Sequence, residues 1–257
     1  MNHRIVIKVG SNVLTRSDGK LDVTRMSALV DQIAWLRQKG YEVILVSSGA
    51  MASGRGELKV SHSLDSVEQR QLFSAVGQVK LIGLYYDLFR EFNIHIGQVL
   101  TMKENFQPGE QYENQRACMT VMLENGVLPI VNENDTVSVT ELMFTDNDEL
   151  SGLIAQMMKA ETLVLLSNID GIYDGHPDDP QSSIIPQVLP GTDLSQYIKE
   201  EKSAFGRGGM HSKYTTAQKV QQQGIRVIIA NGERDDILIN LVKDGQNVPH
   251  TEFIPCN

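Results

Sequence analysis

Two lysines stand among glycine and small hydroxyl residues, in settings that suit the binding of a phosphate chain. Lys8 lies near the end of an apolar run and precedes Gly10 and Ser11, and Lys213 closes the glycine-rich segment Gly206–Lys213, where a helix is predicted to begin. The dipole of a helix opposes a lysine in its first turn by about 0.3–1 kcal/mol, and a bound anion removes this cost. Glycines let backbone N–H groups approach such an anion closely. The two lysines therefore predict a polyphosphate site and phosphoryl-transfer chemistry.

Each lysine also has a less specific interpretation. A lysine at the end of a buried strand can extend its ammonium group to solvent, and Gly206–Lys213 could be a surface loop capped by Ser212. The glycine-rich segment matches neither common phosphate loop. The Walker A loop needs Ser or Thr after its lysine, where this chain has Tyr214, and the protein-kinase loop needs glycine where it has His211. The small residues after Lys8 favour a functional role for that lysine.

Two clusters of polar and acidic residues, Asn132–Thr136 and Thr145–Glu149, carry charge that could balance the lysines. The second cluster also suits a helix start, with Thr145 as N-cap and Asp148 at the third helical position, and either cluster could be a solvated loop. Capping needs only one or two polar residues, so two such clusters together with two lysines indicate a charged site. Ser47–Ala50 fits a strand-to-helix turn whose N–H groups bind a carboxylate or phosphate.

Composition excludes several classes of protein. The 257 residues suffice for one large domain, and Lys+Arg 23 against Asp+Glu 32 gives a net charge of −9, the wrong sign for a nucleic-acid binder. Cys118 and Cys256 have no metal-ligand or disulfide spacing, and no histidine pair suits zinc. No apolar run reaches the roughly 18–20 residues that span a bilayer, and no signal peptide is apparent. We expect a cytoplasmic protein.

The elements that must position these residues alternate between strands and helices. The predicted strands are apolar runs at Arg4–Val9, Glu42–Ser47, Ile94–Leu100, Val127–Val131, Thr162–Ser167 and Ile225–Ala230. Helical spacing recurs between them, including a long stretch, Asp65–Phe92, that could break near Gly77 or Gly83. Strands that are apolar throughout predict a three-layer α/β sandwich, in which helices cover both faces of a mostly parallel sheet. The proline-rich stretch Asp170–Pro190 could be a lid, a nucleotide-side loop or an exposed connection.

Polar clusters follow four of the predicted strands directly, at the sheet edge where ligands bind in such folds. These clusters are Lys8–Asn12, Ser47–Ala50, Asn132–Thr136 and Ser167–Asp170. The site is therefore predicted at the carboxyl ends of the strands.

With these motifs in order, the whole chain resembles the amino acid kinase family. The segments that carry the resemblance are Ile7–Ser11, Val46–Ala50, Pro129–Val137, Asp146–Ser151, Asp170–Tyr173 and Gly208–Lys213. The resemblance implies transfer of the γ-phosphoryl group of ATP to the side-chain carboxylate of L-glutamate, which gives glutamyl 5-phosphate for proline synthesis. The alternatives are a sister kinase with another carboxylate or phosphate acceptor, and a non-catalytic amino-acid sensor that needs neither lysine. Departures from the family pattern at Asn12, Thr145 and Asn168 concern details of the nucleotide loops.

The resemblance also implies roles for individual residues. Lys8 and Lys213 are expected to be catalytic, with Asp148 holding both. Ser48, Asp135 and Asn147 are expected to bind glutamate. The residues expected to bind ATP are Lys8, Ser167, Asn168, Arg207, Gly208, Gly209, Met210, His211, Ser212 and Lys213.

Further expectations concern cofactors and partners. ATP is expected to bring Mg²⁺, with the protein ligands of the metal left open. Proline is a possible feedback inhibitor, and a homo-oligomer without membrane or nucleic-acid partners is expected. Many family members carry a C-terminal PUA domain, whereas residues 1–257 are expected to form a single kinase domain without one.

Overall fold

The computed structural model describes residues 3–138, 144, 146–198, 209–244 and 248–256, and their strands form one eight-stranded sheet. The strand order is β3-β4-β2-β1-β5-β7-β8-β6. The strands are β1 (Arg4–Val9), β2 (Glu42–Ser47), β3 (Ile96–Thr101), β4 (Leu128–Glu133), β5 (Thr162–Ser167), β6 (Gln187–Val188), β7 (Arg226–Asn231) and β8 (His250–Phe253). All neighbouring strands pair in parallel except β7 and β8. The six predicted strands are confirmed: β1, β2 and β5 have the predicted bounds, and the ends of the other three differ by one or two residues.

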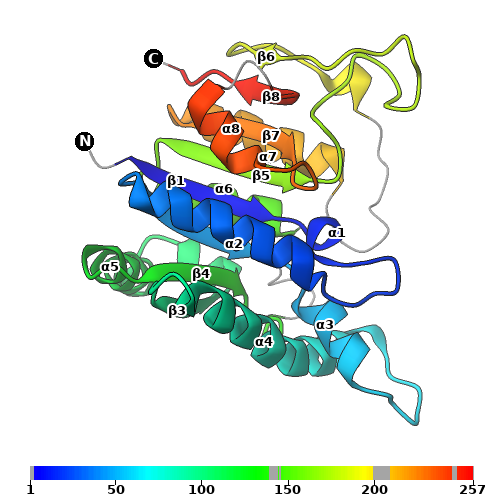
Figure 1. Ribbon diagram of the computed structural model, residues 1–257, viewed down its shortest axis with the longest axis vertical. Coiled ribbons are helices and arrows are strands. Elements are labelled where there is room, and N and C mark those ends of the chain that lie inside the picture. Colours follow the sequence, from blue (N-terminus) through cyan, green and yellow to red (C-terminus); the bar gives the residue numbers. More distant parts are fainter. Residues whose placement is uncertain (1–2, 139–143, 145, 199–208, 245–247, 257) are drawn as a thin grey trace.

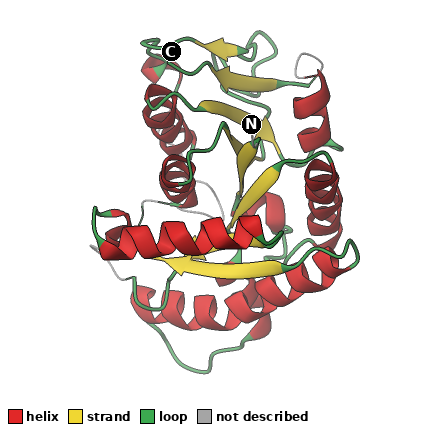
Figure 2. Cartoon of the chain, turned by 90° about the vertical axis from the view of Figure 1, so that its left-hand side faces the viewer, coloured by secondary structure: helices red, strands yellow, loops and turns green. Residues whose placement is uncertain are grey.

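Helices cover both faces of the sheet (Figures 1 and 2). They are α1 (Ser11–Leu14), α2 (Val23–Gln38), α3 (Ala50–Glu57), α4 (Ser66–Arg90), α5 (Glu110–Glu124), α6 (Asn147–Met157), α7 (Met210–Gln222) and α8 (Ile237–Asp244), with 3₁₀ turns η1 (Lys103–Phe106) and η3 (Ser195–Tyr197). One hydrophobic core joins α2, α4 and α8 to the sheet, and the other joins α5, α6 and α7 to its opposite face. In β1, Ile5 and Ile7 enter the first core and Val6 enters the second, as the two-residue period of a strand requires. The predicted three-layer α/β fold is confirmed.

Helix α4 runs unbroken for 25 residues, so the predicted break near Gly77 or Gly83 is wrong. Gly77 allows a close approach between helices, because a Cβ atom placed there would lie 1.8 Å from the carbonyl oxygen of Ala50. Gly54 serves the same purpose from α3, since its Cβ atom would lie 1.8 Å from the carbonyl oxygen of Phe73. These two glycines let α3 and α4 pack backbone against backbone instead of interrupting a helix.

The segment from Asp170 to Pro190 has little regular structure, as predicted. Tyr173 forms an isolated antiparallel bridge with Ile184, and β6 then pairs with β8 at the edge of the sheet. This part of the chain is therefore a connection that the bridge folds back on itself and that β6 ties to the sheet. Over the described residues, no helix is long and apolar enough to cross a membrane.

Candidate active site

The carboxyl ends of the central strands bring the predicted site residues to one edge of the sheet. Lys8 in β1 lies beside Val46 of β2 and Leu165 of β5 in the parallel register, so it occupies the middle of that edge. The polar residues that follow β2, β4 and β5 flank it. The structure thus brings these predicted residues together at the carboxyl ends of the strands.

Asp148 lies between the two lysines that the sequence singled out. The Nζ atom of Lys8 lies 2.6 Å from its Oδ1 atom, and Nζ of Lys213 donates a hydrogen bond to Oδ2 at 2.9 Å. Asp148 is fully buried, and Lys8 and Lys213 are 5% and 7% exposed. Lys8 therefore does not extend to solvent, and each ammonium group is held in place by the same carboxylate.

Burial and charge act against each other in this group. Burial alone would raise the pKa of Asp148, but Lys8 and Lys213 outweigh it and hold the pKa below the usual value. Burial lowers the pKa of Lys8, with Asp148 opposing the shift and Lys213 adding to it. A phosphate anion beside Lys8 would favour the charged form of this lysine.

Asp146, and not Thr145 or Asp148, forms the N-cap of α6. Its Oδ1 atom accepts hydrogen bonds from the backbone N–H groups of Asp148 and Glu149, at 2.8 and 3.1 Å. The alternative in which Asp148 supports the helix start from its third position is therefore wrong, because Asp148 occupies the second position and its side chain binds the lysines. Thr145 lies outside the described residues. With the cap supplied by Asp146, the carboxylate of Asp148 is available for the site.

Sequence reasoning did not assign Asp146 a role, although it belongs to the same acidic cluster. Its side chain is 6% exposed, and its Oδ2 atom has no hydrogen-bond partner among the described residues. Burial, followed by the neighbouring Asp148, raises the pKa of Asp146, and Ser212 and Lys8 oppose the shift. Asp146 thus adds a second buried carboxylate next to Asp148 and Lys8.

Ser48, Asn132 and Asn147 form a hydrogen-bonded group next to the lysines. The Nδ2 atom of Asn147 donates to Oγ of Ser48 at 2.9 Å and to Oδ1 of Asn132 at 3.0 Å. Gly49 follows Ser48 with φ of 103°, a left-handed conformation that turns the chain from β2 into α3. Two of the predicted glutamate-binding residues are thus brought together, and Asn132 joins them from β4.

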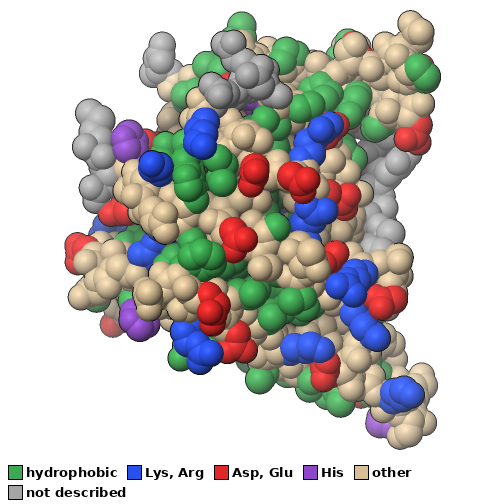
Figure 3. All heavy atoms as spheres, viewed as in Figure 1, with side chains coloured by type: hydrophobic (Ala, Val, Ile, Leu, Met, Phe, Trp, Pro, Cys, Tyr) green, Lys and Arg blue, Asp and Glu red, His purple; other side chains and the backbone are tan. Residues whose placement is uncertain are grey.

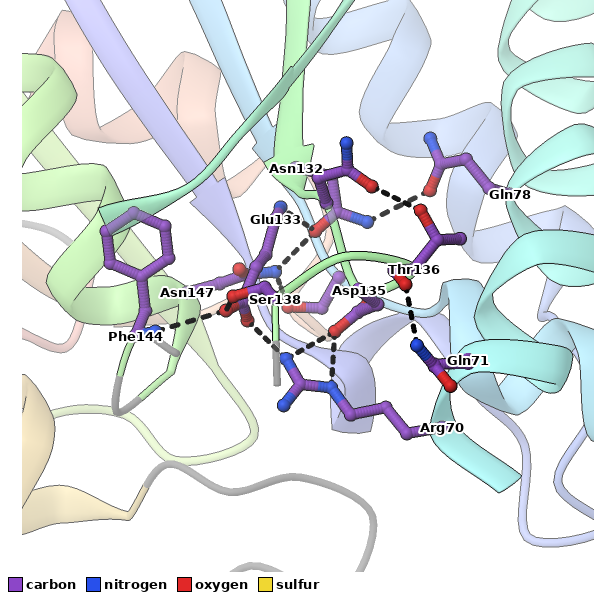
Figure 4. A network of polar contacts seen from close by, with 12 residues as sticks. Arg70, Gln71, Gln78, Asn132, Glu133, Asp135, Thr136, Ser138, Phe144 and Asn147 are labelled. Atoms are coloured by element: carbon purple, nitrogen blue, oxygen red, sulfur yellow. Dashed lines mark hydrogen bonds and ion pairs between the residues drawn. The ribbon is translucent and has the colours of Figure 1, made fainter. Parts of the chain in front are cut away.

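Asp135, the third predicted glutamate-binding residue, is bound to an arginine that the sequence reasoning missed. Oδ1 of Asp135 accepts a hydrogen bond from Nε of Arg70 at 2.7 Å and forms an ion pair with Nη2 of Arg70 at 2.6 Å (Figure 4). Nη2 of Arg70 also lies 2.8 Å from Oε2 of Glu133, which is buried. No local feature distinguishes Arg70 from other helix arginines in the sequence, so only the fold reveals this pairing.

Glu133 connects Arg70 to the segment that follows β4. Its Oε1 atom accepts hydrogen bonds from the hydroxyl group of Ser138 at 2.9 Å and from the backbone N–H of Phe144 at 3.1 Å. Gln71 adds a bond to the carbonyl oxygen of Thr136 at 2.7 Å (Figure 4). Residues 139–143 lie outside the described residues. On either side of them, Ser138 and Phe144 are bonded to β4, and Thr136 is bonded to α4.

The predicted nucleotide side is only partly described. Ser167 and Asn168 follow β5 directly, and Oγ of Ser167 lies 3.4 Å from Oδ1 of Asn168. Just beyond them, both carboxylate oxygens of Asp170 accept hydrogen bonds from Arg234, at 2.6 and 2.7 Å. This fork-like pairing fixes the chain beside Asn168.

The start of α7 suits an anion. Gly209 is the N-cap of this helix and provides no side-chain acceptor for its first N–H groups. Met210, His211 and Ser212 form the first turn, so the alternative in which Ser212 caps a surface loop is wrong. Arg207 and Gly208 lie outside the described residues.

Comparisons with known proteins show the family to which the chain belongs. The profile of the amino acid kinase family matches residues 3–231, so the chain belongs to that family. Solved structures with the same fold include a carbamate kinase from Giardia lamblia bound to AMP-PNP, at a TM-score of 0.70, and a UMP kinase from Ureaplasma parvum, at 0.65. Each is 16% identical, and each comparison covers 99% of both chains.

Relatives of higher identity place the chain within the family. A glutamate 5-kinase from Bacteroides thetaiotaomicron is 65% identical over 98% of this chain, which covers 70% of that relative. Another from Chlorobaculum tepidum is 47% identical over 98% of this chain and 69% of the relative. A third, from Symbiobacterium thermophilum, is 42% identical over 91% of this chain and 90% of the relative. Within the amino acid kinase family, the chain is grouped with the glutamate 5-kinases. The absence of a PUA domain stays a prediction.

Proposed function

We propose that this chain transfers the γ-phosphoryl group of ATP to the side-chain carboxylate of L-glutamate and forms glutamyl 5-phosphate. The observation that carries the proposal is the buried group in which Asp148 holds Lys8 and Lys213. Each ammonium group has three N–H donors, and the described ion pairs of both lysines go to Asp148 alone. Their other donors are suited to the oxygens of the transferred phosphoryl group and of the departing ADP.

This chemistry needs charge stabilisation and alignment more than proton transfer. The side-chain carboxylate of glutamate is already ionised near neutral pH, because the pKa of a free Glu side chain is about 4.3. The reaction therefore needs no general base, and the enzyme must align the two substrates and stabilise charge on the phosphoryl oxygens. Lys8 supplies its charge from the sheet and Lys213 from the start of α7. Asp148 keeps both ammonium groups in position throughout.

The other end of the site suits the amino acid group of glutamate. The carboxylates of Asp135 and Glu133 make this end acidic, as an α-ammonium group requires. Arg70 orients the carboxylate of Asp135 by a hydrogen bond from Nε and an ion pair with Nη2. Ser48 and Asn147 offer hydrogen bonds to the carboxylates of the substrate.

ATP would lie across the carboxyl ends of β5 and β7, with its phosphates near Gly209 and Lys213. Arg207, Gly208, Met210, His211 and Ser212 complete the proposed phosphate-binding segment, and Ser167 and Asn168 line the nucleotide side. No group of three His, Cys, Asp or Glu side chains that could hold a metal occurs in the described part of the chain. Mg²⁺ bound to the ATP oxygens would neutralise phosphate charge, as is common for this ion.

Two alternatives need different features. An amino-acid sensor needs neither lysine, and burying two lysines around one carboxylate is too costly to be expected without a use for their charge. A sister kinase would keep the lysines and change the acceptor group.

Proline, if it inhibits this chain, is expected to compete with glutamate at Asp135, because it carries both an α-carboxylate and a positively charged nitrogen.

Steady-state assays with ATP and four acceptors (glutamate, acetylglutamate, aspartate and UMP) test the proposal. Glutamate should be the preferred substrate, and Lys213→Ala should lower kcat by about 10²–10³, the usual loss for one transition-state donor. The matched control is Lys103→Ala, which removes a half-exposed lysine that lies 3.2 Å from Glu149 at the first turn of α6. It should retain nearly full activity. Preference for another acceptor, or retention of a third of kcat by Lys213→Ala, would contradict the proposal.

A further inference from the structure

A cavity lies beneath α8, at the amino-terminal edge of the sheet and away from Lys8 and Asp148. Its volume is about 160 Å³, and it is lined by the starts of β1, β5 and β7 together with residues of α8. Arg4 lines the cavity, and Lys8 lies four residues further along β1, about 13 Å away. Figure 3 shows basic, histidine and hydrophobic side chains exposed close together on the left side of the molecule, where Figure 1 places the start of β1 and α8. The cavity therefore lies at an edge that the site around Lys8 does not use.

The floor of the cavity is aliphatic. Side chains at the same register position of neighbouring parallel strands point to the same face, and Thr162 of β5 lies beside both Ile5 of β1 and Arg226 of β7. Val164 and Ile228 form the next pair on that face, which α8 covers. A cavity of about 150 Å³ with a similar lining holds one benzene molecule, so this floor has room for a branched aliphatic side chain. The apolar residues that line it are Ile5, Val164, Ile228, Leu238, Leu241 and Val242.

Two opposite charges lie at the mouth of the cavity without pairing with each other. The side chains of Glu161 and Arg226 are 47% and 35% exposed, and the backbone N–H of Arg226 donates to the carbonyl oxygen of Glu161 at 3.2 Å. Oε2 of Glu161 lies 2.9 Å from Nδ1 of His3, and Nε of Arg226 pairs with Glu252. In the part of the chain that the structure describes, Oε1 of Glu161 and both Nη atoms of Arg226 have no hydrogen-bond partner. The mouth therefore offers an acceptor and a pair of donors on strands about 4.8 Å apart.

A ligand with a single charge fits this mouth poorly. An anion would meet Glu161 and Glu252, and a cation would meet Arg226 and Arg4. An α-amino acid carries its ammonium and carboxylate groups on one carbon atom, so the two groups can reach partners on neighbouring strands. Hydrogen bonds between charged groups are roughly twice as strong as those between neutral groups. The combination of paired charges and an aliphatic floor thus selects a zwitterion with an apolar side chain.

We propose that this cavity binds an α-amino acid with a branched aliphatic side chain, such as leucine or isoleucine. The carboxylate of the ligand accepts hydrogen bonds from the Nη atoms of Arg226, and its ammonium group donates to Oε1 of Glu161. The side chain fills the aliphatic floor beneath α8. Because this site lies at the opposite edge of the sheet from Ser48 and Asn147, leucine bound here would not compete with glutamate, whichever acceptor the kinase site uses.

Calorimetric titration with leucine and two of its analogues tests the site. Isopentylamine lacks the carboxylate group and isocaproate lacks the ammonium group, so each should bind about 10–100-fold more weakly than leucine, the worth of one charged hydrogen bond. Saturating glutamate should leave the Kd of leucine unchanged. Absence of leucine binding at millimolar concentrations, equal binding of either analogue, or displacement of leucine by glutamate would overturn the proposal.

Variants of the cavity test its assignment. Arg226→Gln and Glu161→Gln should each weaken leucine binding by about 10–100-fold, and Val242→Phe should abolish it by filling the floor. Arg116→Gln is the matched control, because it removes a half-exposed arginine that pairs with Glu113 on α5, outside the cavity. Leucine at 100 times its Kd should raise the Tm of the wild-type chain by roughly 5–11 °C and leave the Tm of Val242→Phe unchanged. A cooperative thermal transition without leucine shows that each variant folds. Undiminished binding by Val242→Phe, or an equal loss in Arg116→Gln, would place the ligand elsewhere and overturn the proposal.

Discussion

Replacing Asp148 with asparagine leaves the ammonium groups of Lys8 and Lys213 buried near one another without the carboxylate that now binds both. The sequence alone suggests a mild effect on stability, because asparagine is as good a helix cap as aspartate. The structure predicts a different result, since Asp146 forms the cap and Asp148 is a fully buried ion-pair partner. Removing one partner of a buried ion pair costs about 3–5 kcal/mol. We expect Asp148→Asn to destabilise the protein by that amount near neutral pH.

In a chain of this length, such a loss corresponds to a decrease in Tm of roughly 6–20 °C. The folded-state pKa of Asp148 lies below its ordinary value of 3.8. Its stabilising contribution is therefore complete above pH 3.8 and is lost as the pH falls through the folded-state pKa. The kcat of Asp148→Asn should fall by at least 10²–10³, because both lysines lose their position. Thermal melts across a pH series and steady-state kinetics measure these effects.

Asp146→Asn is the matched control, because it changes the other buried carboxylate at the same helix end and keeps an Oδ1 acceptor for the cap. A double variant, Lys8→Met with Asp148→Asn, removes one of the stranded charges and should recover part of the lost stability. Stability of Asp148→Asn within about 0.5 kcal/mol of wild type at pH 7 would refute the reasoning. So would an equal loss in Asp146→Asn.

Four further predictions follow from the same contacts. Asp135→Asn should raise the glutamate KM about 10–100-fold, the worth of one charged hydrogen bond, and leave the KM for glutarate, which lacks the ammonium group, unchanged. Arg70→Met should raise the glutamate KM, with less effect on kcat and on the ATP KM, and Arg70→Lys should restore part of the affinity for glutamate. Equal changes in the KM values for glutamate and ATP would contradict a positioning role for Arg70. The pKa of Asp146 is raised above 3.8 in the folded state, so its ionisation opposes folding. Asp146→Asn should therefore gain stability relative to wild type as the pH rises above 3.8. A stability difference that does not change with pH would contradict this prediction. Gly77→Ala should destabilise the folded protein by about 1–3 kcal/mol or more, measured by urea unfolding, because its Cβ atom would lie 1.8 Å from the carbonyl oxygen of Ala50. Gly83→Ala is the control: the space around this glycine is open, so the change should be neutral or stabilising.

The elements of the fold could be read from the sequence because their signals are local. Six strands appear as short apolar runs bounded by polar turns, and a strand that is apolar at every position must be buried on both faces. The strands β6 and β8 were missed because they are short and half-exposed and carry no such run. The break predicted in α4 was wrong because a glycine signals flexibility in a sequence but close helix packing in this fold.

The location of the site was also present in the sequence. Polar clusters that directly follow buried parallel strands must meet at one sheet edge, whatever the order of the strands. For this reason the sequence alone places Lys8, Ser48 and Asn132 together. Lys213 was identified by its glycines and by its place at a helix start.

No local pattern in the sequence decides the pairings within the site: the family resemblance implied that Asp148 holds both lysines, and the pairing of Arg70 with Asp135 was not expected. Asp148 meets Lys213 across 65 residues of sequence, and Arg70 meets Asp135 across the same separation. Asp146 caps α6 and Asp148 binds the lysines because of the positions that Lys8 in β1 and Lys213 in α7 occupy in the fold. The sequence around Asp148 does not indicate those positions. Local patterns report how a segment interacts with solvent and with its own backbone, whereas an ion pair between distant segments exists only when packing has brought both groups to the same place.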